Sequence, residues 1–184
     1  MKAKKLLLAT LTVMCAIVLT TVFTSCSKDD DDNKTTDDNK PTAAVMDYSL
    51  TVGDDMFNYL DLTVEYYDAN GKVQSEQMTE KTWKKTVQAN LPATLGARLK
   101  MQVKSSVNPA TLEKFTEDVK YSYSVNPVNA RGIELSGGKG YSNHPTLDMP
   151  DDKVTDWVER HADGLVKFLY VFDANGQVTE SSWQ

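Results

Sequence analysis

Residues 95–104, Leu-Gly-Ala-Arg-Leu-Lys-Met-Gln-Val-Lys, carry the clearest structural pattern in the chain. Apolar residues occupy the odd positions from 95 to 103, and glycine or polar residues occupy the even positions from 96 to 104. Successive side chains of a β-strand point to opposite faces, so this alternation predicts a strand with one buried and one exposed face. The stretch therefore favours a mainly β fold.

The same alternation recurs on both sides of this stretch, over residues 45–52, 60–66 and 119–125. A more polar segment from Lys72 to Thr79 suits the edge of a sheet. Residues 165–172 are nearly all apolar, as expected of a strand buried on both faces. Residues 83–91 fit either a short strand or a helical turn.

Two nearly identical turns punctuate the pattern, Asp68-Ala69-Asn70-Gly71 and Asp173-Ala174-Asn175-Gly176. In such a turn the aspartate caps the bend, and the glycine takes the positive φ needed to enter the next strand. Both segments are therefore predicted to be hairpins.

Helical signals are few. Val154, Trp157, Val158 and His161 follow a helical spacing after Pro150, which predicts one helix with His161 on its apolar face. Residues 109–115 suggest a short helical crossing. Residues 126–147 contain four glycines and two prolines and are expected to be irregular.

Together these elements predict an antiparallel β-sandwich, immunoglobulin-like, with one helix before the penultimate strand. A curled sheet or small barrel packed on the helix is the alternative.

The chain divides into three regions by composition. Residues 1–25 combine three lysines with an apolar run and small polar residues, the order of a secretory signal peptide. Residues 26–44 are rich in Asp, Asn, Lys and Thr and are predicted to form a flexible tether. Residues 45–184 form a single β-rich globular domain.

The segment Phe23-Thr24-Ser25-Cys26 resembles the lipobox of bacterial lipoproteins, although typical lipoboxes carry Leu where this chain has Phe23. The resemblance implies that Cys26 is lipidated and becomes the new N-terminus. Two or three acyl chains, each buried methylene contributing about 0.8 kcal/mol, would anchor the protein in a membrane almost irreversibly.

The segment Ser27-Lys28-Asp29-Asp30-Asp31-Asp32 resembles the acidic tag of surface-exposed lipoproteins from Bacteroides-like bacteria. This resemblance implies that Lys28 and the four aspartates form an export tag, and that the protein is anchored by lipid in the outer membrane and faces the cell exterior. A solvated spacer is the alternative role.

Charge and cysteine content limit the function. Removing the leader would subtract three of the 20 basic residues and none of the 26 acidic ones, so the formal charge would change from -6 to -9. Nucleic acid is therefore not an expected partner, although a local basic patch is compatible with this balance. The only two cysteines, Cys15 and Cys26, precede the domain, which leaves it without a disulfide, a cysteine nucleophile or a cysteine-based zinc site.

No catalytic or metal-binding motif is found, and no cofactor is expected. The two histidines, His144 and His161, lack a second histidine at metal-ligand spacing. The segment 137–144, Gly-Gly-Lys-Gly-Tyr-Ser-Asn-His, is predicted to be a flexible loop, with a binding loop as the alternative. The candidate ligand contacts are the residues that could stack on or hydrogen-bond to a ligand, namely Trp83, Tyr59, Tyr67, Lys139, Tyr141 and His144.

Two functions are compatible with these features. The first is a non-catalytic surface module that binds a glycan or protein ligand. The resemblance of the tag to that of surface lipoproteins implies a role in nutrient capture. The second is a structural or adhesive subunit that joins another protein through the edge strand from Lys72 to Thr79.

Overall fold

A computed structural model describes residues 38–112 and 114–183. The signal peptide, Cys26 and the acidic tag lie outside the described residues, as does most of the predicted tether. The first strand begins at Pro41, so residues 41–44, assigned above to the tether, are its first four residues. Just before it, Asn129 Nδ2 donates a 2.7 Å hydrogen bond to the carbonyl of Asp38, and Arg131 pairs with the Asp38 carboxylate.

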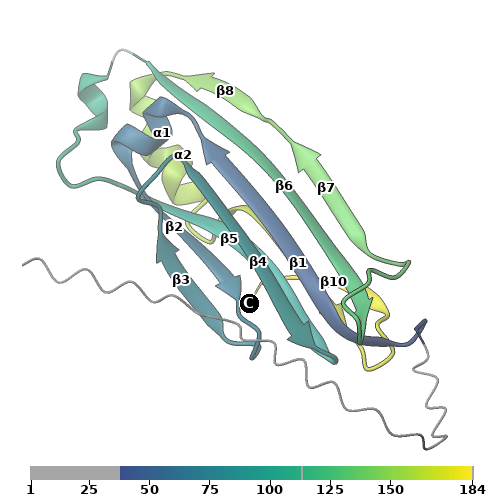
Figure 1. Cartoon of the computed structure of the whole chain (residues 1–184). Helices are drawn as coiled ribbons and strands as arrows, with labels where there is room; N and C mark the ends of the chain where they lie inside the picture. Colours follow the sequence, from purple (N-terminus) through teal and green to yellow (C-terminus); the bar gives the residue numbers. More distant parts are fainter. Residues whose placement is uncertain (1–37, 113, 184) are drawn as a thin grey trace, which may run out of the picture. The chain divides into compact units, whose positions relative to one another are not determined.

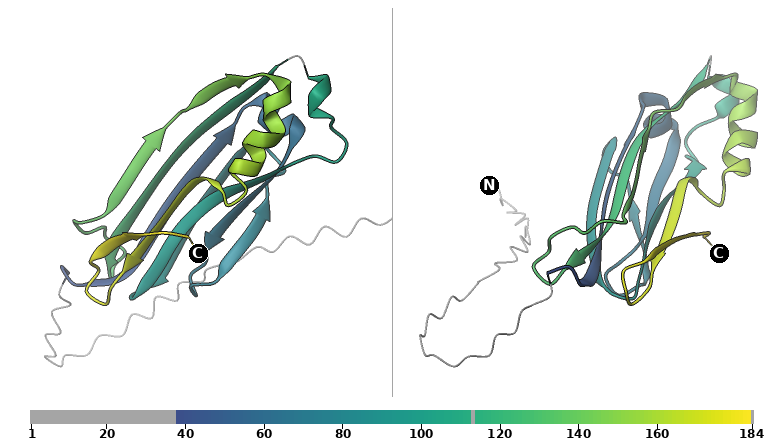
Figure 2. Two further views of the ribbon diagram at one scale, coloured as in Figure 1. Left: turned by 180° about the vertical axis from the view of Figure 1, so that it is seen from behind. Right: turned by 90° about the vertical axis from the view of Figure 1, so that its right-hand side faces the viewer.

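Two antiparallel sheets pack together (Figures 1 and 2). The front sheet, which faces the viewer in Figure 1, has the order β4 (Thr82–Asn90), β1 (Pro41–Val52), β6 (Phe115–Asn129), β7 (Lys139–Asn143), with β8 (Thr146–Met149) also paired to β6. The back sheet has the order β10 (Val178–Ser181), β9 (Leu165–Phe172), β5 (Ala93–Val103), β2 (Leu60–Tyr67), β3 (Val73–Gln77). The prediction of a mainly β protein is confirmed.

The core lies between the sheets and follows the period-two pattern. In β1 the side chains of Met46, Tyr48 and Leu50 are buried, and in β5 those of Leu95 and Leu99 are fully buried. Each such side chain contributes about 1.5–3 kcal/mol when it is removed from water. The apolar positions of the sequence alternation therefore face the core, and the polar positions face the surface.

The centre of the back sheet depends on a close approach between β5 and β9. A Cβ atom on Gly96 would lie 2.5 Å from the carbonyl oxygen of Phe168. Glycine is thus required at this position in the strand, because real Cβ atoms do not approach a backbone oxygen so closely. On the outer face next to it, Arg98 Nε forms a 2.7 Å ion pair with Glu65.

The two predicted hairpin turns have the expected chemistry. Asp68 Oδ1 accepts hydrogen bonds of 2.9 Å from the backbone N–H groups of Asn70 and Lys72, and Asp173 does the same in the second turn at 2.8 Å. Gly71 and Gly176 have φ values of 71° and 75°.

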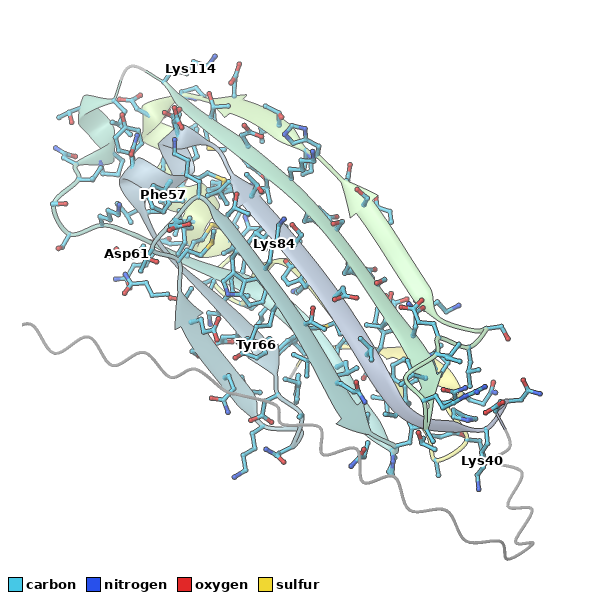
Figure 3. All side chains as sticks on the ribbon, in the orientation of Figure 1. Lys40, Phe57, Asp61, Tyr66, Lys84 and Lys114 are labelled. Atoms are coloured by element: carbon cyan, nitrogen blue, oxygen red, sulfur yellow. The ribbon has the colours of Figure 1, made fainter. Side chains whose placement is uncertain are left out.

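The helices gather at one end of the sheets (Figures 1 and 2). They are α1 (Asp54–Tyr59), η1 (Pro109–Thr111), η2 (Asp151–Lys153) and α2 (Val154–Arg160). Figure 3 marks this end by Lys114, just before β6, and the opposite end by Lys40, just before β1. The helix predicted around Trp157 is confirmed as α2, whereas α1 was not predicted.

Several local predictions are corrected. Residues 83–91 fall mainly in strand β4, which resolves the ambiguity in favour of a strand. The curled sheet or barrel is not the observed arrangement, because no strand ladder joins the two sheets within residues 38–112 and 114–183. The expectation that residues 126–147 are irregular is wrong: β6 continues through Pro127 to Asn129, and β7 and β8 follow. Pro127 is tolerated because it lies beyond the β6–β7 ladder, which ends at Val125.

Candidate functional site

A cleft lined by tyrosines opens between the front and back sheets, on the side where β6 and β7 face β9. Tyr121, Tyr123 and Tyr141 contribute from the front sheet, and Val166 and Phe168 from the back sheet. The cavity measures about 230 Å³. We call it the tyrosine cleft.

Strand register brings the three tyrosines together. Tyr121 and Tyr123 are two residues apart in β6, so both point to the inner face of the front sheet. Tyr141 of β7 is paired with Tyr123, and its ring centroid lies 5.8 Å from that of Tyr121 and 6.3 Å from that of Tyr123. Because β7 is the edge strand, Tyr141 remains 50% exposed.

The inner wall of the cleft is formed by closely packed aromatic rings. The ring of Tyr123 stacks on that of Phe168, with centroids 3.9 Å apart and planes inclined by 15°. Its hydroxyl lies 3.0 Å from that of Tyr170. Burial raises the pKa of Tyr123, and hydrogen bonding to Tyr170 raises it further. The phenol is therefore neutral at physiological pH, and it can both donate and accept a hydrogen bond.

Tyr121 presents a second neutral phenol at the cleft. Burial raises its pKa, while a hydrogen bond with the Asn143 side chain acts in the opposite direction. Asn143 belongs to β7 and is paired with Tyr121 across the ladder. The cleft thus combines exposed ring surface with polar groups on its rim.

A β-bulge shapes the β9 wall. Leu165 is paired with Leu99 and Phe168 with Ala97, so two residues of β9, Val166 and Lys167, face one residue of β5. Val166 has a φ of 49°, which is rare for a β-branched residue and costs on the order of 1–3 kcal/mol. The bulge turns this segment toward the cleft, where both residues line the cavity.

This arrangement suits binding rather than proton transfer. The residues that line the tyrosine cleft offer aromatic faces, phenol hydroxyls and the Lys167 ammonium, and none of them carries a carboxylate or an imidazole. Lys167 is already paired with Asp163. Aromatic faces contact C–H surfaces, and the hydroxyls can hydrogen-bond to a polar ligand.

The structure brings only part of the predicted set to this cleft. Tyr141 lines it, and Lys139 is exposed two residues earlier on the same face of β7. His144 lies beyond the end of β7, with Nε2 2.7 Å from Asp118 Oδ1. Tyr59 is half-buried against Phe115, 6.5 Å between centroids, away from the cleft.

Trp83 and Tyr67, two of the candidate ligand contacts, pack in aromatic clusters away from the tyrosine cleft. Trp83 is only 9% exposed, because β4 alternates and its Lys and Thr neighbours occupy the outer face. Its ring contacts Tyr48 and Tyr66, with centroids 5.3 and 5.7 Å away. Tyr67 is half-buried and packs on Trp183 at 5.0 Å.

The prediction of a flexible loop at residues 137–144 is also wrong, because residues 139–143 form β7. All five residues are exposed, so the strand has no alternation of apolar and polar side chains that a sequence pattern could reveal. Tyr121, Tyr123, Phe168 and Tyr170 were not predicted as site residues. Their signal was two pairs of aromatics at strand spacing, 121/123 and 168/170.

The second histidine has a structural position. His161 ends α2, is half-buried, and its Nδ1 lies 2.8 Å from the carbonyl oxygen of Trp157. This agrees with the predicted place on the apolar face of the helix. Within the described residues, no group of three or more His, Cys, Asp or Glu side chains is arranged to hold a metal ion.

The fold and the cleft define a mainly β protein with two packed antiparallel sheets and an aromatic surface cleft between their edges. Comparisons of the chain with family models, with curated proteins and with solved structures found no match. None of the helices in the described ranges combines the length and apolar character needed to cross a bilayer.

Proposed function

We propose that this protein is a non-catalytic binding module that takes a saccharide in the tyrosine cleft. The observation that carries this proposal is the grouping of Tyr121, Tyr123 and Tyr141 on one inner face, with Tyr141 half exposed at the opening. A sugar ring has apolar C–H faces and equatorial hydroxyls, which match ring faces and neutral phenols respectively.

The size of the cleft limits the ligand. Its volume of about 230 Å³ is below the range of about 300–1,000 Å³ that is usual for drug-sized ligands. A single sugar ring, at the end or branch of a chain, is therefore the proposed occupant.

A matched pair of variants tests the cleft. Tyr141 and Leu147 are both large, about half exposed, and lie on the same edge of the front sheet. We expect Tyr141→Ala to weaken binding of a glycan selected from an array by about twofold to tenfold, since an aromatic contact contributes about 0.5–1.5 kcal/mol. Leu147→Ala serves as the control. A wild-type domain that binds no arrayed glycan, or equal affinities for both variants, would contradict the proposal.

The proposed location is the outer face of the outer membrane, through lipidated Cys26 and the tag from Lys28 to Asp32. The lipobox and acidic tag in the sequence support it. We expect Cys26→Ser to abolish metabolic labelling with a fatty acid. Replacing Asp29 to Asp32 with Ala should preserve that labelling and remove protease accessibility on whole cells. Unchanged accessibility would leave the aspartates as a spacer only.

The second proposed function is a structural or adhesive subunit that associates through an exposed strand edge. It is favoured by the position of β3 at the edge of the back sheet, with Val73 48% exposed. Crosslinking on intact cells should then recover a complex through β3, and recovery of monomer alone would count against it.

The immunoglobulin-like arrangement stays a prediction. The strand orders support two packed antiparallel sheets and no finer assignment.

A further inference from the structure

The outer face of the front sheet is hollowed, on the opposite side of the sheet from the tyrosine cleft. Two depressions of about 540 and 310 Å³ share Ser49, Lys84 and Ser122 and so form one continuous hollow, which we call the outer trough. Figure 1 shows this face of the sheet toward the viewer, and Figure 3 labels Lys84 on it. The helices lie at one end of the sheet and leave this face open.

Strand register explains the hollow. Lys84 is paired with Ser49, Ser49 with Ser122, and Ser122 with Ser142. This row crosses β4, β1, β6 and β7, which lie about 4.8 Å apart. Because three adjacent strands place serine at the same level, the centre of the face is low, and each hydroxyl can donate and accept a hydrogen bond.

The trough also holds two lysines that are free of ion pairs. Lys84 on β4 and Lys120 on β6 lie on either side of β1, and Lys120 is paired with Thr51 in the row next to that of Lys84. Neither lysine takes part in a salt bridge among residues 38–112 and 114–183, although other lysines of the domain do. The half of the trough that contains both lysines is lined by no carboxylate.

A carboxylate is present only in the other half. Asp47 lines that half, and its Oδ1 accepts a 2.5 Å hydrogen bond from Thr86 Oγ1. Lys84 borders both halves, and Lys85, which is paired with Glu76, also borders the half with Asp47. The two halves therefore differ in that only the half with Lys120 has no carboxylate, and an anionic ligand group would be attracted to that half and repelled from Asp47.

We propose that the outer trough is a second binding site, for an acidic polysaccharide whose carboxylate or sulfate groups pair with Lys84 and Lys120. Neutral ring hydroxyls of the same chain would lie toward Asp47 and Ser124. The concave shape favours a polymer chain over an anionic bilayer, because a bilayer presents a flat surface that does not enter the trough. This site is independent of the tyrosine cleft.

Charge-matched double variants test the proposal. Affinity is measured by calorimetry for polygalacturonate, dextran sulfate and neutral dextran. We expect wild type to bind at least one of the two acidic polymers with an affinity that falls as salt increases, and to bind neutral dextran weakly. The affinity of Lys84→Gln/Lys120→Gln for the same polymer should be lower by about tenfold or more, because hydrogen bonds to charged groups are among the stronger hydrogen bonds. Lys72→Gln/Lys100→Gln removes the same charge outside the trough, and its affinity should stay within about twofold of wild type. Exposed charges more than a Debye length from the ligand are screened.

A steric variant separates shape from charge. Ser122→Trp fills the trough without changing net charge and should weaken binding of the same polymer, while circular dichroism reports that the domain is folded. Tyr141→Ala should leave this binding unchanged, so failure of the cleft and failure of the trough are distinguishable. The proposal is overturned if neither acidic polymer binds, if both double variants lose affinity equally, or if phosphatidylglycerol vesicles bind through the two lysines and the polymers do not.

Discussion

Trp83 Nε1 donates a 2.8 Å hydrogen bond to Glu76 Oε2, and this contact joins the edge strand of the front sheet to the edge strand of the back sheet. Glu76 Oε1 also accepts hydrogen bonds from the Tyr66 hydroxyl at 2.7 Å and from Lys85 Nζ at 2.5 Å. The Glu76 carboxylate therefore links the two sheets along this side of the sandwich. An inward-pointing charge on β3 also discourages pairing with another strand, which weakens the case for an adhesive edge.

Replacing Glu76 should destabilise the domain. Glu76→Ala leaves the Trp83 indole, the Lys85 ammonium and the Tyr66 hydroxyl without their shared acceptor, so we expect a loss of about 1–3 kcal/mol in the free energy of unfolding. Glu80→Ala, at an exposed position in the β3–β4 turn, is the control. Urea unfolding measures both. Equal stabilities would show that the cluster contributes nothing to the fold.

The same carboxylate should give the stability a pH dependence. Burial alone would raise the pKa of Glu76, but hydrogen bonds from Lys85, Trp83 and Tyr66 outweigh burial and lower it below its ordinary value of 4.5. A carboxyl whose folded pKa is lowered stabilises the fold fully above its unfolded pKa, and that contribution disappears as pH falls through the folded pKa. We expect the difference in unfolding free energy between wild type and Glu76→Gln to shrink from pH 6 to pH 3. A difference that stays constant with pH would contradict the assignment.

The fold was predictable where one face of a strand is apolar and the other polar. The stretch from Leu95 to Val103 is β5, and the paired turns at Gly71 and Gly176 are hairpins. Trp83 was a candidate ligand contact because its neighbours in sequence are polar, whereas its neighbours in space are Tyr48 and Tyr66. Successive side chains of a strand point to opposite faces, so polar neighbours in the sequence are compatible with a buried side chain between them.

The tyrosine cleft was less predictable because distant strands assemble it. Tyr123 and Phe168 stack at 3.9 Å although 45 positions separate them in the sequence, and only the packing of the two sheets brings them together. Tyr141 was found as a single residue, since β7 is exposed along its whole length and has no core-facing pattern. Residue type alone therefore identified Tyr141, whereas Tyr123 and Phe168 could be assigned to the cleft only from the packing of the sheets.

The close contact at Gly96 gives a sharp steric prediction. A methyl group at Gly96 would meet the Phe168 carbonyl oxygen at 2.5 Å, so Gly96→Ala must push β5 and β9 apart. We expect a loss of about 1–3 kcal/mol in unfolding free energy. Gly140→Ala is the matched control in a strand, since its nearest contact is 3.3 Å. Equal melting temperatures for the two variants would contradict the close approach.

A buried hydroxyl should be dispensable at position 48. Tyr48 is 2% exposed, and its hydroxyl has no hydrogen-bond partner in the described part of the chain. Tyr48→Phe should therefore leave the unfolding free energy unchanged or raise it by about 1 kcal/mol. Tyr170→Phe, which removes the partner of the Tyr123 hydroxyl, should lower it by a similar amount. If Tyr48→Phe were the more damaging of the two, the hydroxyl would have a partner after all.

The strained residue Val166 should lower stability while shaping the tyrosine cleft. Its φ of 49° costs on the order of 1–3 kcal/mol for a β-branched side chain, whereas glycine adopts this region freely but loses about 0.5–1 kcal/mol through its greater entropy when unfolded. We therefore expect Val166→Gly to raise the unfolding free energy by up to about 1 kcal/mol, as measured by urea unfolding. Val171→Gly, in the same strand at a residue that is 40% exposed, should lower it, since its backbone is not in the left-handed region. Because Val166 lines the cleft, Val166→Gly should at the same time weaken the affinity of the domain for the saccharide that is used to test Tyr141→Ala. If Val166→Gly is more stable but binds the saccharide as wild type does, the bulge contributes to the fold and not to binding. If Val166→Gly is less stable, the backbone of Val166 is not strained.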